Sequence, residues 1–151
     1  MAGYSGTPLP RKLGIKDGAR VGLVRAPNGF DRILGELPDG VAPRAIGRGK
    51  APFDVIVCFV TAAKQLGDLS ALKQRLDPAG GLWVAWPKKT RKAKPTSGVP
   101  PIETDVDETK VRSMGLATGL VDNKVCAIDE LWSGLRFVVR VADRPAKSAT
   151  R

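Results

Sequence analysis

The side chains best suited to chemistry gather near the end of the chain, where Asp129, Trp132, Ser133 and Arg136 lie close together. A serine hydroxyl becomes a nucleophile only when a neighbouring base takes its proton, and histidine is the usual base. The chain of 151 residues contains no histidine. We therefore interpret the four residues as a structural turn cluster, in which Asp129 and Arg136 form an ion pair and Trp132 packs over it.

The lack of histidine also bears on metals and on proton transfer. It excludes Cys-His nucleophilic pairs, His-ligated metals and the side chain that usually titrates near neutral pH. The two cysteines, Cys58 and Cys126, are too few for a four-thiolate zinc site. Both fall within predicted strands, where a reduced thiol behaves as a small apolar side chain. We predict no catalytic residue, no metal and no cofactor.

Positive charge at two predicted strand ends could instead bind an anion. Arg25 ends the first predicted strand, and Asn28 and Gly29 follow at the start of a predicted helix, whose free N–H groups attract anions. Lys88 and Lys89 directly follow a later strand. Carboxyl ends of parallel strands meet at one edge of a sheet, where ligands enter. The hypothetical ligand-binding residues are therefore Arg25, Asn28, Gly29, Lys88 and Lys89. The alternative is an arginine beside an ordinary helix cap.

The net charge of +10 raises a nucleic-acid hypothesis. Half of this excess comes from one short stretch, with the cations Lys88, Lys89, Arg91, Lys92 and Lys94. A solvated basic loop is the simpler interpretation of such a run. The alternative is an arm that contacts backbone phosphates with strongly salt-dependent affinity. The predicted partners are an anionic small molecule or an acidic protein surface, with nucleic acid as an alternative and no membrane.

The elements that must position these residues alternate between strand and helix. Strands are predicted over 19–25, 53–60, 82–86, 119–128 and 135–141, with a weak strand over 41–46. The run FDVIVCFV is β-branched and almost wholly apolar, which is typical of a central parallel strand covered on both faces. This order predicts an α/β fold, a Rossmann-like three-layer sandwich with a mostly parallel sheet and an antiparallel edge.

Three helices are predicted between the strands. We expect Asn28 to cap the first and Thr61 the second, and Asp105 with Glu108 to form a capping box for the third. Gly67 is placed to kink the second helix or to split it in two. The apolar stripe of that helix consists of Leu66, Leu69, Leu72 and Leu76.

This length fits one domain. We expect residues 1–18 to be an extended N-terminal lead-in and residues 19–141 to form the α/β domain, with a basic mobile loop over 88–101. Residues 142–151 are expected to be a disordered basic tail. The N-terminus lacks the layout of a secretion signal, and the longest apolar run, 55–60, is too short to cross a membrane. We therefore expect a cytoplasmic protein.

The order of elements resembles the Rossmann-like fold of S-adenosylmethionine (SAM)-dependent methyltransferases. FDVIVCFV and DPAGGLWVAWPKK are similar to the fourth strand of that fold and to the strand that follows a Pro-Gly-Gly turn. Three segments, LGIKDGARVGLVRAPNGF, GGLWVAWPKK and GLVDNKVCAIDELWSGLRFVVR, more closely resemble a bacterial family named domain of unknown function 3052, over about residues 8–141. This resemblance implies the fold and no particular activity.

Such methyltransferases end their first strand with an acidic residue and a G-x-G-x-G turn, because the backbone must approach the cofactor without a Cβ. Aligned on VGLVRAPNG, the acidic position is Leu23, two glycine positions are Arg25 and Pro27, and only Gly29 is kept. The weak second strand ends in Gly47-Arg48, without the carboxylate that would hold a ribose.

These departures favour a non-catalytic, degenerate methyltransferase-like protein, a binding or regulatory module for an anionic ligand or partner. One alternative is a group-transfer enzyme, such as a methyltransferase, with an atypical cofactor pocket. Another is a nucleic-acid-associated protein that uses the basic loop over 88–94.

Overall fold

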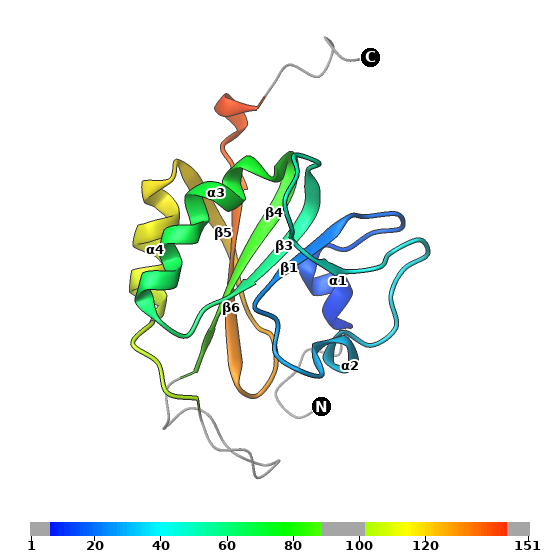
Figure 1. Ribbon diagram of the computed structural model, residues 1–151, viewed down its shortest axis with the longest axis horizontal. Coiled ribbons are helices and arrows are strands. Elements are labelled where there is room, and N and C mark those ends of the chain that lie inside the picture. Colours follow the sequence, from blue (N-terminus) through cyan, green and yellow to red (C-terminus); the bar gives the residue numbers. More distant parts are fainter. Residues whose placement is uncertain (1–6, 89–101, 145–151) are drawn as a thin grey trace.

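The computed structural model describes residues 7–88 and 102–144, which build one six-stranded sheet in the order β2-β1-β3-β4-β6-β5 (Figure 1). From β2 to β4, neighbouring strands pair in parallel, whereas β6 runs antiparallel to both β4 and β5. The predicted α/β class, with a mostly parallel sheet and an antiparallel end, is confirmed. The strands are β1 (Val21–Val24), β2 (Arg44–Ala45), β3 (Phe53–Phe59), β4 (Leu76–Pro87), β5 (Leu120–Ala127) and β6 (Trp132–Val139).

Helices cover both faces of the sheet. Figure 1 shows α3 and α4 on one face and α1 and α2 on the other, which gives the predicted three layers. The helices are α1 (Leu9–Leu13), α2 (Phe30–Leu34), α3 (Leu69–Gln74) and α4 (Glu108–Ala117), with short 3₁₀ helices η1 (Ala63–Asp68) and η2 (Val141–Asp143). Among the described residues, no helix is both long and apolar enough to pass through a bilayer.

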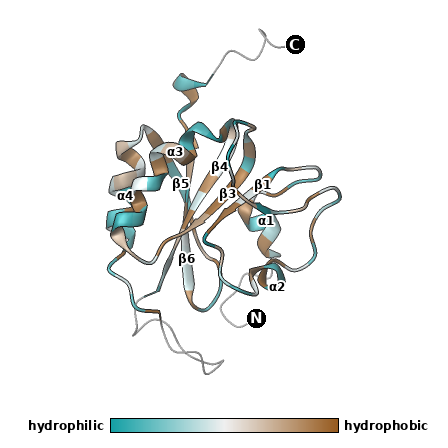
Figure 2. Cartoon of the chain, in the orientation of Figure 1, coloured by the Kyte–Doolittle hydropathy of each residue, from teal (hydrophilic) through white to brown (hydrophobic). Residues whose placement is uncertain are grey.

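Each face of the sheet has its own apolar core. Successive side chains of a strand point to opposite faces. Ile56 and Cys58 therefore pack toward α3 and α4, whereas Val57 and Phe59 pack toward α1 and α2. Since β3 and β4 are covered on both sides, they read as continuous apolar runs, which Figure 2 shows as brown central strands. Trp83 of β4 is fully buried, and its indole Nε1 donates to the carbonyl of Leu13 at 3.0 Å, which fastens α1 to the sheet.

The N-terminal lead-in is not extended throughout. Residues Leu9–Leu13 form α1, with Pro10 in its first turn and Gly14 ending it at a φ of 83°. Proline is tolerated in the first turn of a helix because the N–H it lacks has no partner there. The expectation of an extended segment was wrong for these residues because it took the prolines as signs of extended chain. Leu13 and Ile15 are buried against the sheet and hold the helix in place.

The helix starts differ from the predicted caps. Gly29, with a φ of 85°, is the N-cap of α2, in place of Asn28. Asp107 caps α4, because its side chain accepts from the N–H of Lys110 at 2.9 Å. Asp105 instead accepts from the N–H of Ala63 at 2.8 Å, so it joins two segments that lie far apart in the sequence.

The predicted second helix is split in two. Its first part is η1 and its second part is α3, with the change just after Gly67. The N-cap is Ala62 rather than Thr61, and the side chain of Gln65 accepts from the N–H groups of both residues, at 2.8 Å for Thr61 and 3.2 Å for Ala62. Leu76 belongs to β4, where it pairs with Phe53.

Candidate functional site

The switch point of the sheet lies between β1 and β3. From β1 the chain passes outward to β2 and then returns to β3 on the other side of β1. In open α/β sheets, ligands bind outside the carboxyl ends of the strands at such a reversal. Arg25 directly follows β1 at this edge, and Val60 directly follows β3.

The side chain of Arg25 closes this switch point. Its Nε donates to the carbonyl of Phe59 at 2.8 Å, and its Nη1 donates to the carboxylate of Asp68 at 2.7 Å. Its Nη2 lies 3.4 Å from the sulfur of Cys58. The guanidinium therefore reaches from the end of β1 across the carboxyl end of β3. Because the charge of this guanidinium is paired with Asp68, the Arg25 side chain is not available as an unpaired cation for an anionic ligand.

The backbone of Arg25 has a conformation that favours glycine. Its φ is 56°, and it is the one non-glycine residue with a positive φ in the described part of the chain. This left-handed region costs residues with a Cβ roughly 1–2 kcal/mol. The alignment of VGLVRAPNG places Arg25 at the first glycine position of the G-x-G-x-G turn. The conformation is what such a position predicts, but a long side chain now fills the space beside it.

Asn28 and Gly29 lie in the same turn, exposed at the start of α2. That helix is only 5 residues long, and no side chain caps it. The guanidinium of Arg25 contacts β3 and Asp68 rather than this turn. The structure thus brings the three residues into one loop without joining them in an anion cradle.

Lys88 lies at the same edge, at the end of β4. Its backbone N–H donates to the carbonyl of Leu131 at 2.8 Å, and its side chain is partly exposed. The remaining cations of the predicted basic arm lie outside the described residues, so their role stays a prediction: these are Lys89, Arg91, Lys92 and Lys94.

The segment that leads into α4 covers the carboxyl end of β3 from another side. The hydroxyl of Thr104 donates to the carbonyl of Thr61 at 2.7 Å, and Asp105 accepts from the N–H of Ala63. Polar backbone groups that follow β3 are therefore satisfied within the chain. Sequence reasoning missed this contact, since it interpreted Asp105 as a helix cap and had no signal for a partner 42 residues away.

Cys58 sits beneath the guanidinium and is fully buried. Burial raises the pKa of its thiol to about 11, although the charge of Arg25 acts in the opposite direction. A thiol with such a pKa is protonated at neutral pH, and the thiolate is the nucleophilic form. Cys58 is therefore an apolar core residue and not a reactive thiol.

Thiol labelling checks this assignment. At about pH 8, Ellman's reagent should modify the half-buried Cys126 first and reach Cys58 roughly a hundredfold or more slowly, at a rate set by opening of the core. The variant Cys126→Ser leaves Cys58 as the single thiol. Fast labelling of that variant under native conditions would contradict the buried position, and unfolding in guanidinium should restore full reactivity.

The turn cluster is ordered in another way than predicted. The carboxylate of Asp129 accepts from the backbone N–H groups of Leu131 at 2.8 Å and Trp132 at 2.9 Å. The predicted ion pair with Arg136 is wrong, because β6 already begins at Trp132 and carries Arg136 about 13 Å further along the strand. Ser133 also belongs to β6, paired with Trp86 of β4 and Ala127 of β5. The ring of Trp132 packs edge-on against Phe59 at 5.0 Å.

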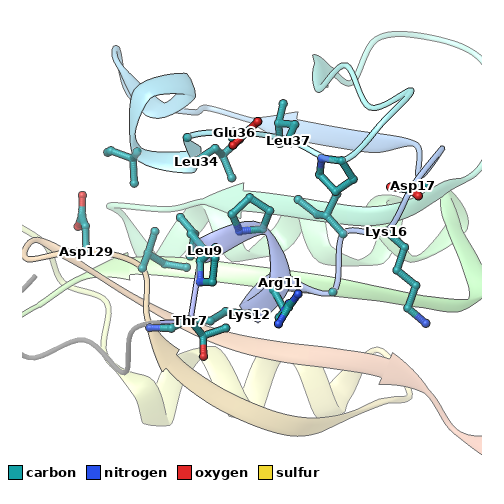
Figure 3. A pocket seen from close by; sticks show the side chains of 18 residues that line it. Thr7, Leu9, Arg11, Lys12, Lys16, Asp17, Leu34, Glu36, Leu37 and Asp129 are labelled. Carbon is teal, nitrogen blue, oxygen red and sulfur yellow. The ribbon is translucent and has the colours of Figure 1, made fainter.

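A cavity of about 960 Å³ lies apart from the switch point, between α1, α2 and residues 35–38. Its walls are largely apolar, including Leu9, Leu34 and Leu37 (Figure 3). Its charged side chains have both signs and balance one another: Arg11, Lys12 and Lys16 against Asp17, Glu36 and Asp129. Sequence reasoning missed the cavity because one wall is α1, where no helix was expected.

The described residues offer no metal site of ordinary composition. Nowhere among them do three side chains of Cys, Asp or Glu come together as metal ligands.

Comparison with solved structures defines the class of fold. The chain is similar to a SAM-dependent methyltransferase from Aquifex aeolicus, with a TM-score of 0.58, 18% identity and coverage of 84% of this chain and 85% of that chain. It is also similar to magnesium protoporphyrin IX methyltransferase from Synechocystis, with a TM-score of 0.55, 14% identity and coverage of 82% and 74%. For Aeropyrum pernix fibrillarin, whose structure holds natively bound S-adenosyl-L-methionine, the TM-score is 0.56 at 11% identity, with coverage of 90% and 70%.

The fold is therefore that of the Rossmann-like SAM methyltransferases, and identities this low show the fold alone. No protein-family model matches the chain, and no curated protein matches it. The resemblance to the bacterial domain of unknown function 3052 stays a prediction.

Proposed function

We propose that this protein is a non-catalytic binding module with a methyltransferase fold, and that its ligand or partner is anionic. The observation that carries the first part is the side chain of Arg25, which bridges β1 to the carbonyl of Phe59 and to Asp68. A nucleoside at this switch point would have to displace the guanidinium and break its ion pair. The net charge of +10 supports an anionic partner.

A second contact supports the same conclusion on the other side of β1. The side chain of Ile46, which follows β2, packs directly over Gly22 of β1, so that a Cβ at Gly22 would meet it at 2.6 Å. Dinucleotide-binding folds place an acidic residue near the end of the second strand, where it holds the ribose. In this chain β2 ends in Arg44–Ala45 and is followed by an apolar residue.

Titration with SAM and with S-adenosylhomocysteine tests the proposal. A compound that binds only the native state raises the free energy of unfolding by about 2.7 kcal/mol at a hundred times its Kd. The melting temperature rises accordingly. We expect no shift and no heat of binding for this protein at millimolar concentrations of either compound. Aeropyrum pernix fibrillarin serves as the positive control, because its structure holds the methyl donor. A saturable shift in the wild-type protein would contradict the proposal and favour the alternative, a methyltransferase with an atypical pocket.

The variant Arg25→Gly sharpens this experiment. It removes the guanidinium and returns glycine to a position with a φ of 56°. The side chains of the lost ion pair are 33% exposed for Arg25 and 50% exposed for Asp68. Because water screens such a pair, it contributes at most about 1 kcal/mol to the free energy of unfolding. Relief of the backbone conformation offsets a loss of this size, and we expect the variant to fold. Binding that arises only in the variant would identify the guanidinium itself as the block.

A further inference from the structure

Arg136 is a half-buried cation for which the described part of the chain supplies no ion-pair partner. It lies in β6 on the face of the sheet that α1 covers in part, and its guanidinium lies over Gly81 of β4, where a Cβ would overlap it. Arginine in a partly desolvated position is usually paired with a carboxylate. Within residues 7–88 and 102–144, no ion pair or side-chain hydrogen bond involves Arg136.

Two cations, Lys124 and Arg144, lie near Arg136. Lys124 of β5 stands directly opposite it in the antiparallel pair, so both side chains lie on the same face. Burial lowers the pKa of the Arg136 guanidinium below its ordinary value, and the charge of Arg144 lowers it further. The Nζ of Lys124 donates to the carbonyl of Lys12 at 3.3 Å, which brings the last turn of α1 to the same place.

Lys12 and Lys124 also lie near the thiol of Cys126. The pKa of Cys126, two residues beyond Lys124 on the same strand, is raised by burial, and Lys12 and Lys124 both act to lower it. We call Lys12, Lys124, Arg136 and Arg144 the basic face. The carboxylates that form the described ion pairs are all elsewhere, bonded to Arg25 and Arg112.

We propose that the basic face binds a ligand with two or more phosphate groups. Like charges that directly oppose each other across two strands destabilise a sheet, and a bound anion would relieve that repulsion. A guanidinium offers two parallel N–H donors that match phosphate oxygens, and an ammonium adds a point charge. The cations of the basic face come from α1, β5, β6 and the end of η2, so a ligand with several anionic groups matches them better than a single carboxylate does.

The same face offers little to a nucleobase. The exposed large apolar side chains of the described chain are Met114, Leu116, Val125 and Val141, none of them aromatic. Aromatic rings are the usual platforms for base stacking, so we expect the contacts to be mainly with phosphates. Two sources of that chemistry remain to be separated by experiment, a free polyphosphate compound and a nucleic-acid backbone.

The basic face lies away from the switch point. Arg136 lies over Gly81 near the start of the regular part of β4, whereas Arg25 lies at the carboxyl ends of the parallel strands. The inference rests on the part of the proposed function that concerns an anionic ligand. Its failure would leave the SAM result unchanged, and binding of SAM would leave the basic face untouched.

Titration calorimetry at low salt with inorganic tripolyphosphate, and separately with a short DNA duplex, tests the inference. We expect saturable binding of at least one probe, with an affinity that falls as salt rises. Binding of tripolyphosphate alone would indicate a small phosphorylated ligand, and tighter binding of the duplex would indicate a nucleic-acid backbone. No binding of either probe would overturn the inference.

Variants locate the site. Lys124→Gln, at an exposed strand position, and Arg136→Gln should each weaken binding about tenfold, since each removes charge-assisted hydrogen bonds. The slope of log K against log salt should also fall by about one for each lost phosphate contact. The matched control Lys64→Gln removes one charge from the exposed surface of η1, on the other face of the sheet, and should change affinity less than about twofold.

Equal losses in Lys64→Gln and Lys124→Gln would show that only net charge attracts the probe, and would overturn the inference. Should Arg136→Gln fail to fold, Lys124→Gln decides alone. Amide spectra of the ¹⁵N-labelled protein provide a second readout. They should shift on tripolyphosphate addition along β5 and β6 around Lys124 and Arg136, and shifts confined to other segments would contradict the site.

Discussion

Replacing Trp83 with alanine is expected to lower the free energy of unfolding by about 3–5 kcal/mol, because it removes the largest fully buried side chain. The ring fills the core between β4 and the helices α1 and α2, so truncation leaves a cavity that its neighbours close only in part. Urea unfolding followed by circular dichroism measures the loss. A cost below about 1 kcal/mol would contradict the buried position of the ring.

The variant Trp83→Phe separates packing from hydrogen bonding. It keeps an aromatic ring but loses the indole donor, so the buried carbonyl of Leu13 is left without that partner, at a cost of about 1–3 kcal/mol. This loss should fall on α1, which the bond fastens to the sheet. Hydrogen exchange in Leu9–Leu13 should therefore speed up in both variants, while β3 stays protected in Trp83→Phe.

The elements best predicted from the sequence are those whose environment leaves a pattern in it. The run FDVIVCFV matches β3 to within a residue, since a strand covered on both faces needs apolar side chains at successive positions. The sequence also predicted that Gly67 kinks or divides the second helix, and the structure shows the division. Helix α1 was not predicted, because prolines near the start of a helix also occur in extended chain, which is what they predicted here.

The contacts at the switch point depend on tertiary structure and could not be predicted from the sequence. The alignment placed Arg25 at a glycine position, and its left-handed backbone agrees with that placement. Its ion-pair partner, Asp68, is 43 residues away. Such a partner is decided by how η1 packs beside β3, which no local pattern encodes. The prediction for Arg136 failed for a related reason. Its expected partner, Asp129, lies before the start of β6 and accepts from the N–H of Leu131, whereas Arg136 lies further along that strand.

Gly81 is predicted to lie in a turn but lies within a strand, beneath the guanidinium of Arg136. In the sequence it belongs to the run DPAGG, which predicts a turn. In the structure it lies within β4, and the missing side chain is the space in which the guanidinium of Arg136 lies. Glycine inside a strand often marks a close approach of another group. The basic face could have been suspected from that rule only with the pairing of β4 and β6 in hand.

Replacing Gly115 with alanine should destabilise the protein, although alanine is the better helix former. Helix propensity alone predicts a gain of about 1 kcal/mol. Gly115 is buried where α4 meets β6, and a Cβ there would overlap the ring of Phe137. That ring is fully buried among close-packed side chains, so overpacking should cost about 1–3 kcal/mol and exceed the gain. Gly115→Val should cost more, because it adds two methyl groups and a β-branch.

The matched control for Gly115 is Gly67→Ala. Gly67 also lies in a helical segment, but a Cβ there would meet nothing within 4 Å, and its backbone is not left-handed. With the clash absent, this variant should be neutral or stabilised by up to about 1 kcal/mol. Opposite signs for the two glycines in urea unfolding would show that α4 is held against β6 by close contact of its backbone with Phe137. A stabilised Gly115→Ala variant would mean that α4 stands further from the sheet than the structure places it.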